Sequence, residues 1–103
     1  MSNMTILLVE DNADDELLAL RALKKTDVPN DVVVTRDGQE ALDYIFGQGK
    51  FQGRDIRLLP KVVFLDLKLP KLDGLEVLRK IRQDERTKRL PVVLLTSSDE
   101  VQD

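Results

Sequence analysis

The chain has 103 residues and a formal net charge of −3 at pH 7, and hydrophobic residues make up 42% of it. This length fits a single domain, residues 1–103, and the composition is that of a globular protein. The chain contains no cysteine and no histidine, which excludes disulfides, thiolate metal sites and most hydrolytic triads. Carboxylate, hydroxyl, amine and backbone chemistry remain.

Targeting signals are absent from the sequence pattern. No apolar run approaches the roughly 20 residues of a membrane span, and the segment Met1–Met4 lacks the pattern of a secretory signal. We therefore expect a cytoplasmic protein without membrane contacts.

Charge is distributed unevenly along the chain. Residues 1–53 hold 10 acidic and 5 basic side chains, whereas residues 54–103 hold 9 acidic and 11 basic ones. The acidic total argues against a nucleic-acid partner. The basic second half fits either an acidic partner or an ordinary solvated helix face, and the sequence leaves both open.

The first half of the chain predicts two strands and two helices. The apolar run Thr5–Val9 is typical of a strand buried on both faces. Asn12 is a suitable N-cap for a following helix, which carries leucines at positions 17, 18, 20 and 23. Val32–Thr35 predicts a second strand, and the capping pattern that begins at Asp37 opens a helix through about Phe46.

The second half repeats this alternation after a long loop at residues 47–60, which is either a docking surface or a tolerated insertion. Val62–Asp66 predicts a third strand, and Asp73 caps a third helix. Pro91–Thr96 predicts a fourth strand, and Ser97–Glu100 is a further capping box. The predicted inner face of the third helix carries Leu75, Leu78 and Ile81.

This β-α-β-α-β-α-β order predicts an α/β fold, with parallel strands in an open sheet and helices on both faces. The capping box at Ser97–Glu100 announces a fourth helix, but only three residues follow it. A helix that short cannot sustain itself. We therefore expect the chain to be truncated at the start of that helix.

Acidic and hydroxyl side chains follow three of the predicted strands. Glu10 and Asp11 follow the first strand, Asp66 ends the third, and Thr96 and Ser97 end the fourth. Because parallel strands place their carboxyl ends at one edge of the sheet, these groups should converge. Clustered carboxylates repel one another, and an all-oxygen set suits Mg²⁺.

Each of these residues also has a purely structural interpretation. Glu10 and Asp11 could cap the first helix, Asp66 could begin an ordinary turn, and Thr96 could simply end a strand. Because all three positions fall at the same edge of the predicted sheet, we favour a shared binding site over three separate structural roles.

Three segments carry a resemblance to a known family: Leu8–Asn12, Leu65–Gly74 and Pro91–Ser97. In this order and spacing they resemble the receiver domain of two-component response regulators, most closely the stand-alone, phytochrome-associated type. The resemblance implies a flavodoxin-like doubly wound sheet with strand order 2-1-3-4, the family's fifth strand and fifth helix being missing from this chain.

The resemblance also implies a set of roles. Asp66 would accept a phosphoryl group from a histidine kinase or phosphotransfer protein, and Thr96 would contact the phosphoryl oxygen. Glu10, Asp11, Asp66 and the backbone carbonyl of Lys68 would hold Mg²⁺. Pro70 and Gly74 match the turn of the family motif, where glycine permits a close approach. Such a domain modifies itself and is not an enzyme with turnover.

The sequence departs from the family at its end. Receivers carry a lysine at the end of a fifth strand, and no residue here matches it, so we expect impaired phosphotransfer. The open sheet edge favours either self-association, such as a homodimer, or a chain that is the visible part of a longer polypeptide. The alternative is a phosphorylation-independent scaffold or engineered fragment that self-associates. A phosphohydrolase is disfavoured, because Lys68 stands where such enzymes carry a second aspartate.

Overall fold

The computed structural model describes residues 4–25, 30–68 and 73–95. The alternation of strands and helices predicted from the sequence is confirmed over these ranges. In chain order the elements are β1 (Met4–Val9), α1 (Ala13–Lys24), β2 (Asn30–Thr35), α2 (Gly38–Phe46), the 3₁₀ turn η1 (Gly49–Phe51), β3 (Val62–Asp66), α3 (Gly74–Gln83) and β4 (Val92–Leu95).

The four strands form one parallel sheet in the order β2-β1-β3-β4. β1 lies in the interior of the sheet, with Val9 opposite Thr35 of β2 and Leu65 of β3. This is the predicted flavodoxin-like strand order. The predicted strand Pro91–Thr96 is observed as Val92–Leu95, and the predicted fourth helix start, Ser97–Glu100, lies outside the described residues.

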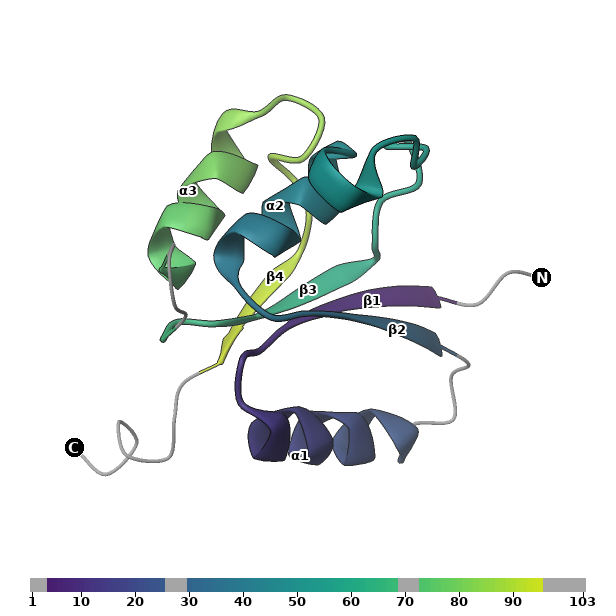
Figure 1. Cartoon of the computed structure of the whole chain (residues 1–103), viewed down its shortest axis with the longest axis vertical. Helices are drawn as coiled ribbons and strands as arrows, with labels where there is room; N and C mark the ends of the chain where they lie inside the picture. Colours follow the sequence, from purple (N-terminus) through teal and green to yellow (C-terminus); the bar gives the residue numbers. More distant parts are fainter. Residues whose placement is uncertain (1–3, 26–29, 69–72, 96–103) are drawn as a thin grey trace.

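Helices cover both faces of the sheet: α1 lies on one face, and α2 and α3 lie on the other (Figure 1). The main core fills the space between the sheet and the α2/α3 layer. Fully buried side chains from the strands and helices meet there: Leu7, Val9, Ala41, Ile45, Val63, Leu65, Val77 and Ile81. Because side chains alternate along a strand, Ile6 and Leu8 are buried on the α1 face. The double burial predicted for the first strand is therefore confirmed.

The predicted inner face of α3 is partly wrong. Ile81 is buried and Leu78 packs against the core, but Leu75 is exposed and Val77 is buried in its place. At 100° per residue, positions 74, 77 and 81 share one stripe and position 75 lies outside it.

The α1 layer is more open than the opposite layer. No residue of α1 is buried, and the Leu18 side chain remains 62% exposed. Over the parts of the chain that the structure describes, none of the helices has the length and apolar character to cross a bilayer.

The long loop at residues 47–60 packs against the carboxyl end of α2. Gly47 ends the helix in the left-handed conformation at φ 66°, and its N–H donates to the Asp43 carbonyl. The Arg54 guanidinium donates to the Tyr44 carbonyl at 2.7 Å and to the Ile45 carbonyl at 3.2 Å. These bonds satisfy carbonyls that a helix end leaves unpaired. The loop therefore completes α2.

Candidate metal and phosphoacceptor site

Three carboxylates meet at the carboxyl ends of β1 and β3. Glu10, Asp11 and Asp66 each offer an oxygen, and these oxygens all lie within 4.8 Å of one another. The sheet creates this proximity, because the pairing of Val9 with Leu65 brings the residues that follow them to the same edge. The predicted convergence of acidic side chains is therefore present in the fold.

Glu10 is the most buried of the three, with 4% of its surface exposed. Its backbone N–H donates to the Thr35 carbonyl at 2.9 Å, which fixes its place beside β2. Burial raises the pKa of its carboxyl from 4.5 to about 7, against the hydrogen bond from the Asn12 N–H and with a contribution from Asp66. A cation at this position would stabilise the ionised form.

Asp66 ends β3 with 8% of its surface exposed. Its Oδ1 accepts a hydrogen bond from the Lys68 backbone N–H at 2.9 Å. The start of α3 packs directly against this turn. A Cβ added to Gly74 would lie 2.6 Å from the Asp66 carbonyl oxygen, so only glycine fits there. The expected close approach at Gly74 is confirmed.

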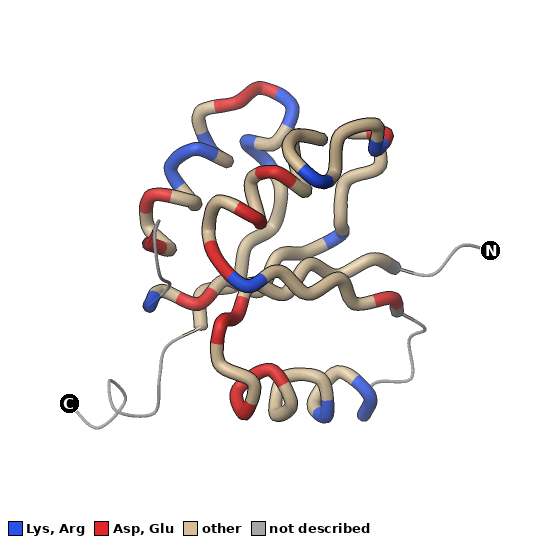
Figure 2. Tube along the Cα trace, viewed as in Figure 1, with Lys and Arg blue, Asp and Glu red and all other residues tan. Residues whose placement is uncertain are grey.

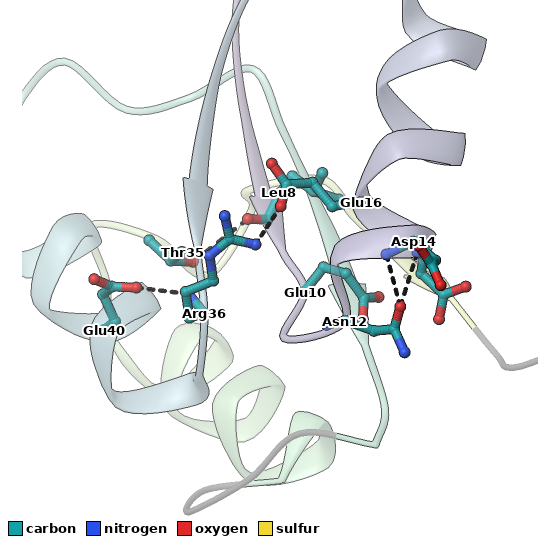
Figure 3. Close-up of polar contacts among 9 residues, drawn as sticks. Leu8, Glu10, Asn12, Asp14, Glu16, Thr35, Arg36 and Glu40 are labelled. Carbon is teal, nitrogen blue, oxygen red and sulfur yellow. Dashed lines mark hydrogen bonds and ion pairs between the residues drawn. The ribbon is translucent and has the colours of Figure 1, made fainter.

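Glu10 and Asp11 are not needed as caps of the first helix, because Asn12 caps α1. The Asn12 side-chain oxygen accepts from the N–H groups of Asp14 and Asp15 at 2.8 and 3.1 Å, as Figure 3 shows. The predicted N-cap is confirmed. Asp11, the third carboxylate of the cluster, is exposed.

Two residues named from the sequence cannot be placed. Thr96, the expected phosphoryl contact, and Pro70 lie outside the described residues. Lys68 is described, and its side chain is exposed.

Arg36 is a neighbour of the site that the sequence reasoning missed. It follows β2, its guanidinium pairs with Glu16 of α1, and its backbone N–H donates to Glu40 of α2 at 2.6 Å (Figure 3). It therefore ties helices on opposite faces to the end of β2. Its position in the sequence could have pointed to it, because Arg36 directly follows β2 as Glu10 directly follows β1.

Together, the fold and the acidic cluster identify the chain as an α/β domain of the receiver type. The model of the response regulator receiver domain family matches residues 6–103. The chain belongs to this family, which serves two-component signalling.

Known relatives support this assignment. The chain is 41% identical over 93 residues to response regulator Rcp1 of Synechocystis, covering 90% of this chain and 61% of that protein. It is 44% identical over 93 residues to the probable methanogenesis regulatory protein FilR2 of Methanothrix harundinacea, covering 90% of this chain and 57% of that protein. The chain thus spans about three fifths of the length of these curated relatives.

Among solved structures, the bacteriophytochrome response regulator AtBRR is similar over 100% of this chain and 73% of its own, with TM-score 0.88 and 51% identity. The Mn²⁺-bound form of Rcp1 is similar over 96% of this chain and 71% of its own, with TM-score 0.82 and 38% identity. The resemblance to phytochrome-associated regulators is thereby confirmed.

Proposed function

We propose that Asp66 accepts a phosphoryl group from a phosphohistidine of a histidine kinase or phosphotransfer protein. A new bond joins an Asp66 carboxylate oxygen to phosphorus while the phosphorus–nitrogen bond breaks. The leaving imidazole keeps the electron pair and takes a proton from solvent. The chemistry needs a carboxylate and no histidine on this chain, in keeping with its composition.

We propose that Glu10, Asp11, Asp66 and the Lys68 backbone carbonyl hold Mg²⁺. The donor set fits, because hard divalent cations prefer carboxylate and carbonyl oxygens and keep several waters. When bound, the cation neutralises charge on the phosphoryl group. Support also comes from the relatives: the Rcp1 structure is described as Mn²⁺-bound, and a receiver domain of Pseudomonas aeruginosa PA1611 as having Mg²⁺ in its active-site cleft.

The protein's own residues orient the acceptor. The Lys68 N–H fixes one Asp66 oxygen, and the packing of Gly74 fixes the turn that carries it. We propose that Thr96 contacts the phosphoryl oxygen. The added charge of about −1.5 to −2 then switches a protein-interaction surface.

We also propose that the domain acts in the cytoplasm, modifies itself rather than turning over a separate substrate, and binds proteins rather than nucleic acid.

The proximity of the three carboxylates is the observation that carries this proposal. Its test is incubation of the chain with Mg²⁺ and acetyl phosphate, followed by intact-mass measurement. We expect the mass of one phosphoryl group to be added to the wild type and to Asp14→Asn, a matched change at a nearby exposed carboxylate. Asp66→Asn should remain unmodified, and equal modification of Asp66→Asn would overturn the assignment.

A second function, a phosphorylation-independent scaffold that self-associates, is favoured by one observation. β4 is an edge strand of the described sheet, and its Val93 and Leu94 side chains are 43% and 41% exposed. Exposed edge strands pair with other chains. A chain that forms dimers but does not bind Mg²⁺ at millimolar concentration would support this function instead.

A further inference from the structure

A groove of about 760 Å³ lies at the opposite end of the sheet from the acidic site. It opens where Lys61 leads into β3 and Pro91 leads into β4. With a rise of about 3.3 Å per residue, the length of β3 separates it from Asp66 by roughly 13 Å. The groove is therefore distinct from the phosphoacceptor site.

Apolar side chains line part of this groove. Pro60 and Leu90 are buried, Leu59 is half-buried and Pro91 is exposed. The Leu90 backbone is fixed by its N–H bond to the Thr87 carbonyl at 2.9 Å and by the bond from the Arg82 guanidinium to the Leu90 carbonyl at 2.6 Å. The groove thus offers an apolar surface on an ordered segment.

Among the described residues that line it, five are basic and one, Glu85, is acidic; the basic ones are Arg57, Lys61, Arg86, Lys88 and Arg89. Figure 2 shows basic segments at the turns that lead into β3 and β4, the second of which also carries an acidic segment, and it shows acidic segments where β1 ends and α1 begins. The groove is therefore locally positive on a chain whose net charge is −3.

Neighbouring acids neutralise only part of this charge. Arg57 is paired with Asp55, Arg86 with Asp84, and Lys88 with Glu85. Lys61 and Arg89 are exposed and form no ion pair with any residue in the described ranges. Two cations beside an apolar surface are thus available to an external anion.

We propose that this groove binds an acidic peptide segment of a partner protein, one that alternates carboxylates with apolar side chains. The carboxylates pair with Lys61 and Arg89, and the apolar side chains contact Leu59 and Pro91. The groove's volume lies within the range of about 300–1,000 Å³ that is typical of ligand sites. Complementary charge at such a surface steers association and sets specificity.

The chemistry of the groove favours a peptide over a nucleic acid. None of its lining residues in the described ranges is aromatic, and single-stranded nucleic acids are held mainly by stacking of their bases on aromatic rings together with backbone charge. The acidic net charge of the chain also disfavours a polyanion as long as a nucleic acid.

The test measures binding of a short fluorescent peptide that repeats Asp-Glu-Leu to the 103-residue chain. We expect saturable binding that weakens as salt is added, because screening acts on exposed charges. The double variant Lys61→Gln/Arg89→Gln should weaken binding roughly fivefold or more. The matched double variant Arg21→Gln/Lys80→Gln, which removes the same charge from other exposed positions, should bind as the wild type does. Circular dichroism melting confirms that each variant folds.

Two further ligands test whether the apolar surface and the basic side chains of the groove contribute to binding beyond general charge attraction. A peptide that repeats Asp-Glu-Ser should bind more weakly than Asp-Glu-Leu if the apolar surface contributes. The proposal is overturned by no binding at millimolar peptide, by equal weakening in both double variants, or by equal binding of the two peptides. It is also overturned if oligodeoxythymidylate of matched length binds more tightly than the peptide and responds to Lys61→Gln/Arg89→Gln.

Discussion

The carboxylates of Glu10 and Asp66 approach within 4.8 Å of each other, although the two residues expose only 4% and 8% of their surface. Two buried carboxylates that close disfavour each other's ionisation unless a proton or a cation lies between them. The sheet forces this proximity, since each residue directly follows a core position of its strand, Val9 and Leu65. The stability of the fold should therefore depend on whether a proton or a cation lies between Glu10 and Asp66.

The first prediction is that Mg²⁺ stabilises the chain through this cluster. Saturating Mg²⁺ at about 100 times its dissociation constant should add about 2.7 kcal/mol to the free energy of unfolding. Asp11→Asn removes an exposed ligand oxygen without disturbing the core and should weaken Mg²⁺ binding about tenfold or more. Thermal melts across a Mg²⁺ titration measure both effects. Asp14→Asn is the control, and a loss of affinity there equal to that in Asp11→Asn would contradict the prediction.

The second prediction concerns pH in the absence of metal. The pKa of Glu10 is about 7 in the folded chain, against an ordinary value of 4.5. Between these values the folded state holds a proton that the unfolded state has lost, so stability falls as pH rises and then levels off above 7. At about 1.4 kcal/mol per pKa unit, the loss is roughly 3 kcal/mol.

Urea unfolding in EDTA from pH 5 to pH 8 measures this slope. Glu10→Gln cannot ionise, so its stability should change less than that of the wild type over this range. The difference between the two proteins removes contributions from other carboxyls, such as that of Glu40, whose pKa the neighbouring Lys50 lowers. Parallel pH profiles for wild type and Glu10→Gln would contradict the assignment.

The third prediction concerns the packing of Gly74 against the Asp66 turn. An alanine Cβ there would meet the Asp66 carbonyl oxygen at 2.6 Å and the Leu67 Cα at 2.8 Å. Both are backbone atoms, so α3 or the turn must shift, and Gly74→Ala should cost about 1–3 kcal/mol. It should also weaken Mg²⁺ binding, because the turn carries Asp66. Leu75→Ala, at the exposed next position, should change stability by less than about 0.5 kcal/mol.

Sequence reasoning predicted the sheet and the acidic cluster because both depend on simple periodicities. A buried parallel strand reads as an apolar run such as Thr5–Val9, and the carboxyl ends of such strands share an edge, which places Glu10 near Asp66. The contacts of Arg36 and Arg54 could not be predicted in this way. Each side chain reaches elements distant in sequence, and no local pattern specifies such a partner.

The exposure of Leu75 shows a second limit. An apolar residue in the first turn of an amphipathic helix satisfies the pattern, but the exact rotation of α3 is set by how Gly74 seats against β3. That rotation is a tertiary property. The sequence pattern therefore located the helix correctly. Of the three residues it assigned to the buried stripe, only Leu75 is misplaced, and Val77 is buried instead.

The last prediction concerns Arg54, which joins the long loop to α2. Its guanidinium lies 4.1 Å from the centre of the Tyr44 ring and donates to the carbonyls of Tyr44, Ile45 and Leu58. Arg54→Lys keeps the charge but loses the planar fork that reaches these carbonyls together. We expect it to lower the free energy of unfolding by about 1–2 kcal/mol, within the usual range for losing partly buried hydrogen bonds to a helix end.

Arg57→Lys is the matched control for this substitution, because Arg57 lies in the same loop and pairs only with the exposed Asp55 in the described part of the chain. Its unfolding midpoint in urea should stay close to that of the wild type. Mg²⁺ binding should be retained in Arg54→Lys, since the loop lies away from the carboxyl ends of β1 and β3 (Figure 1). Equal stability of Arg54→Lys and wild type would mean that the loop is a tolerated insertion, as one sequence interpretation had it, rather than part of the support of α2.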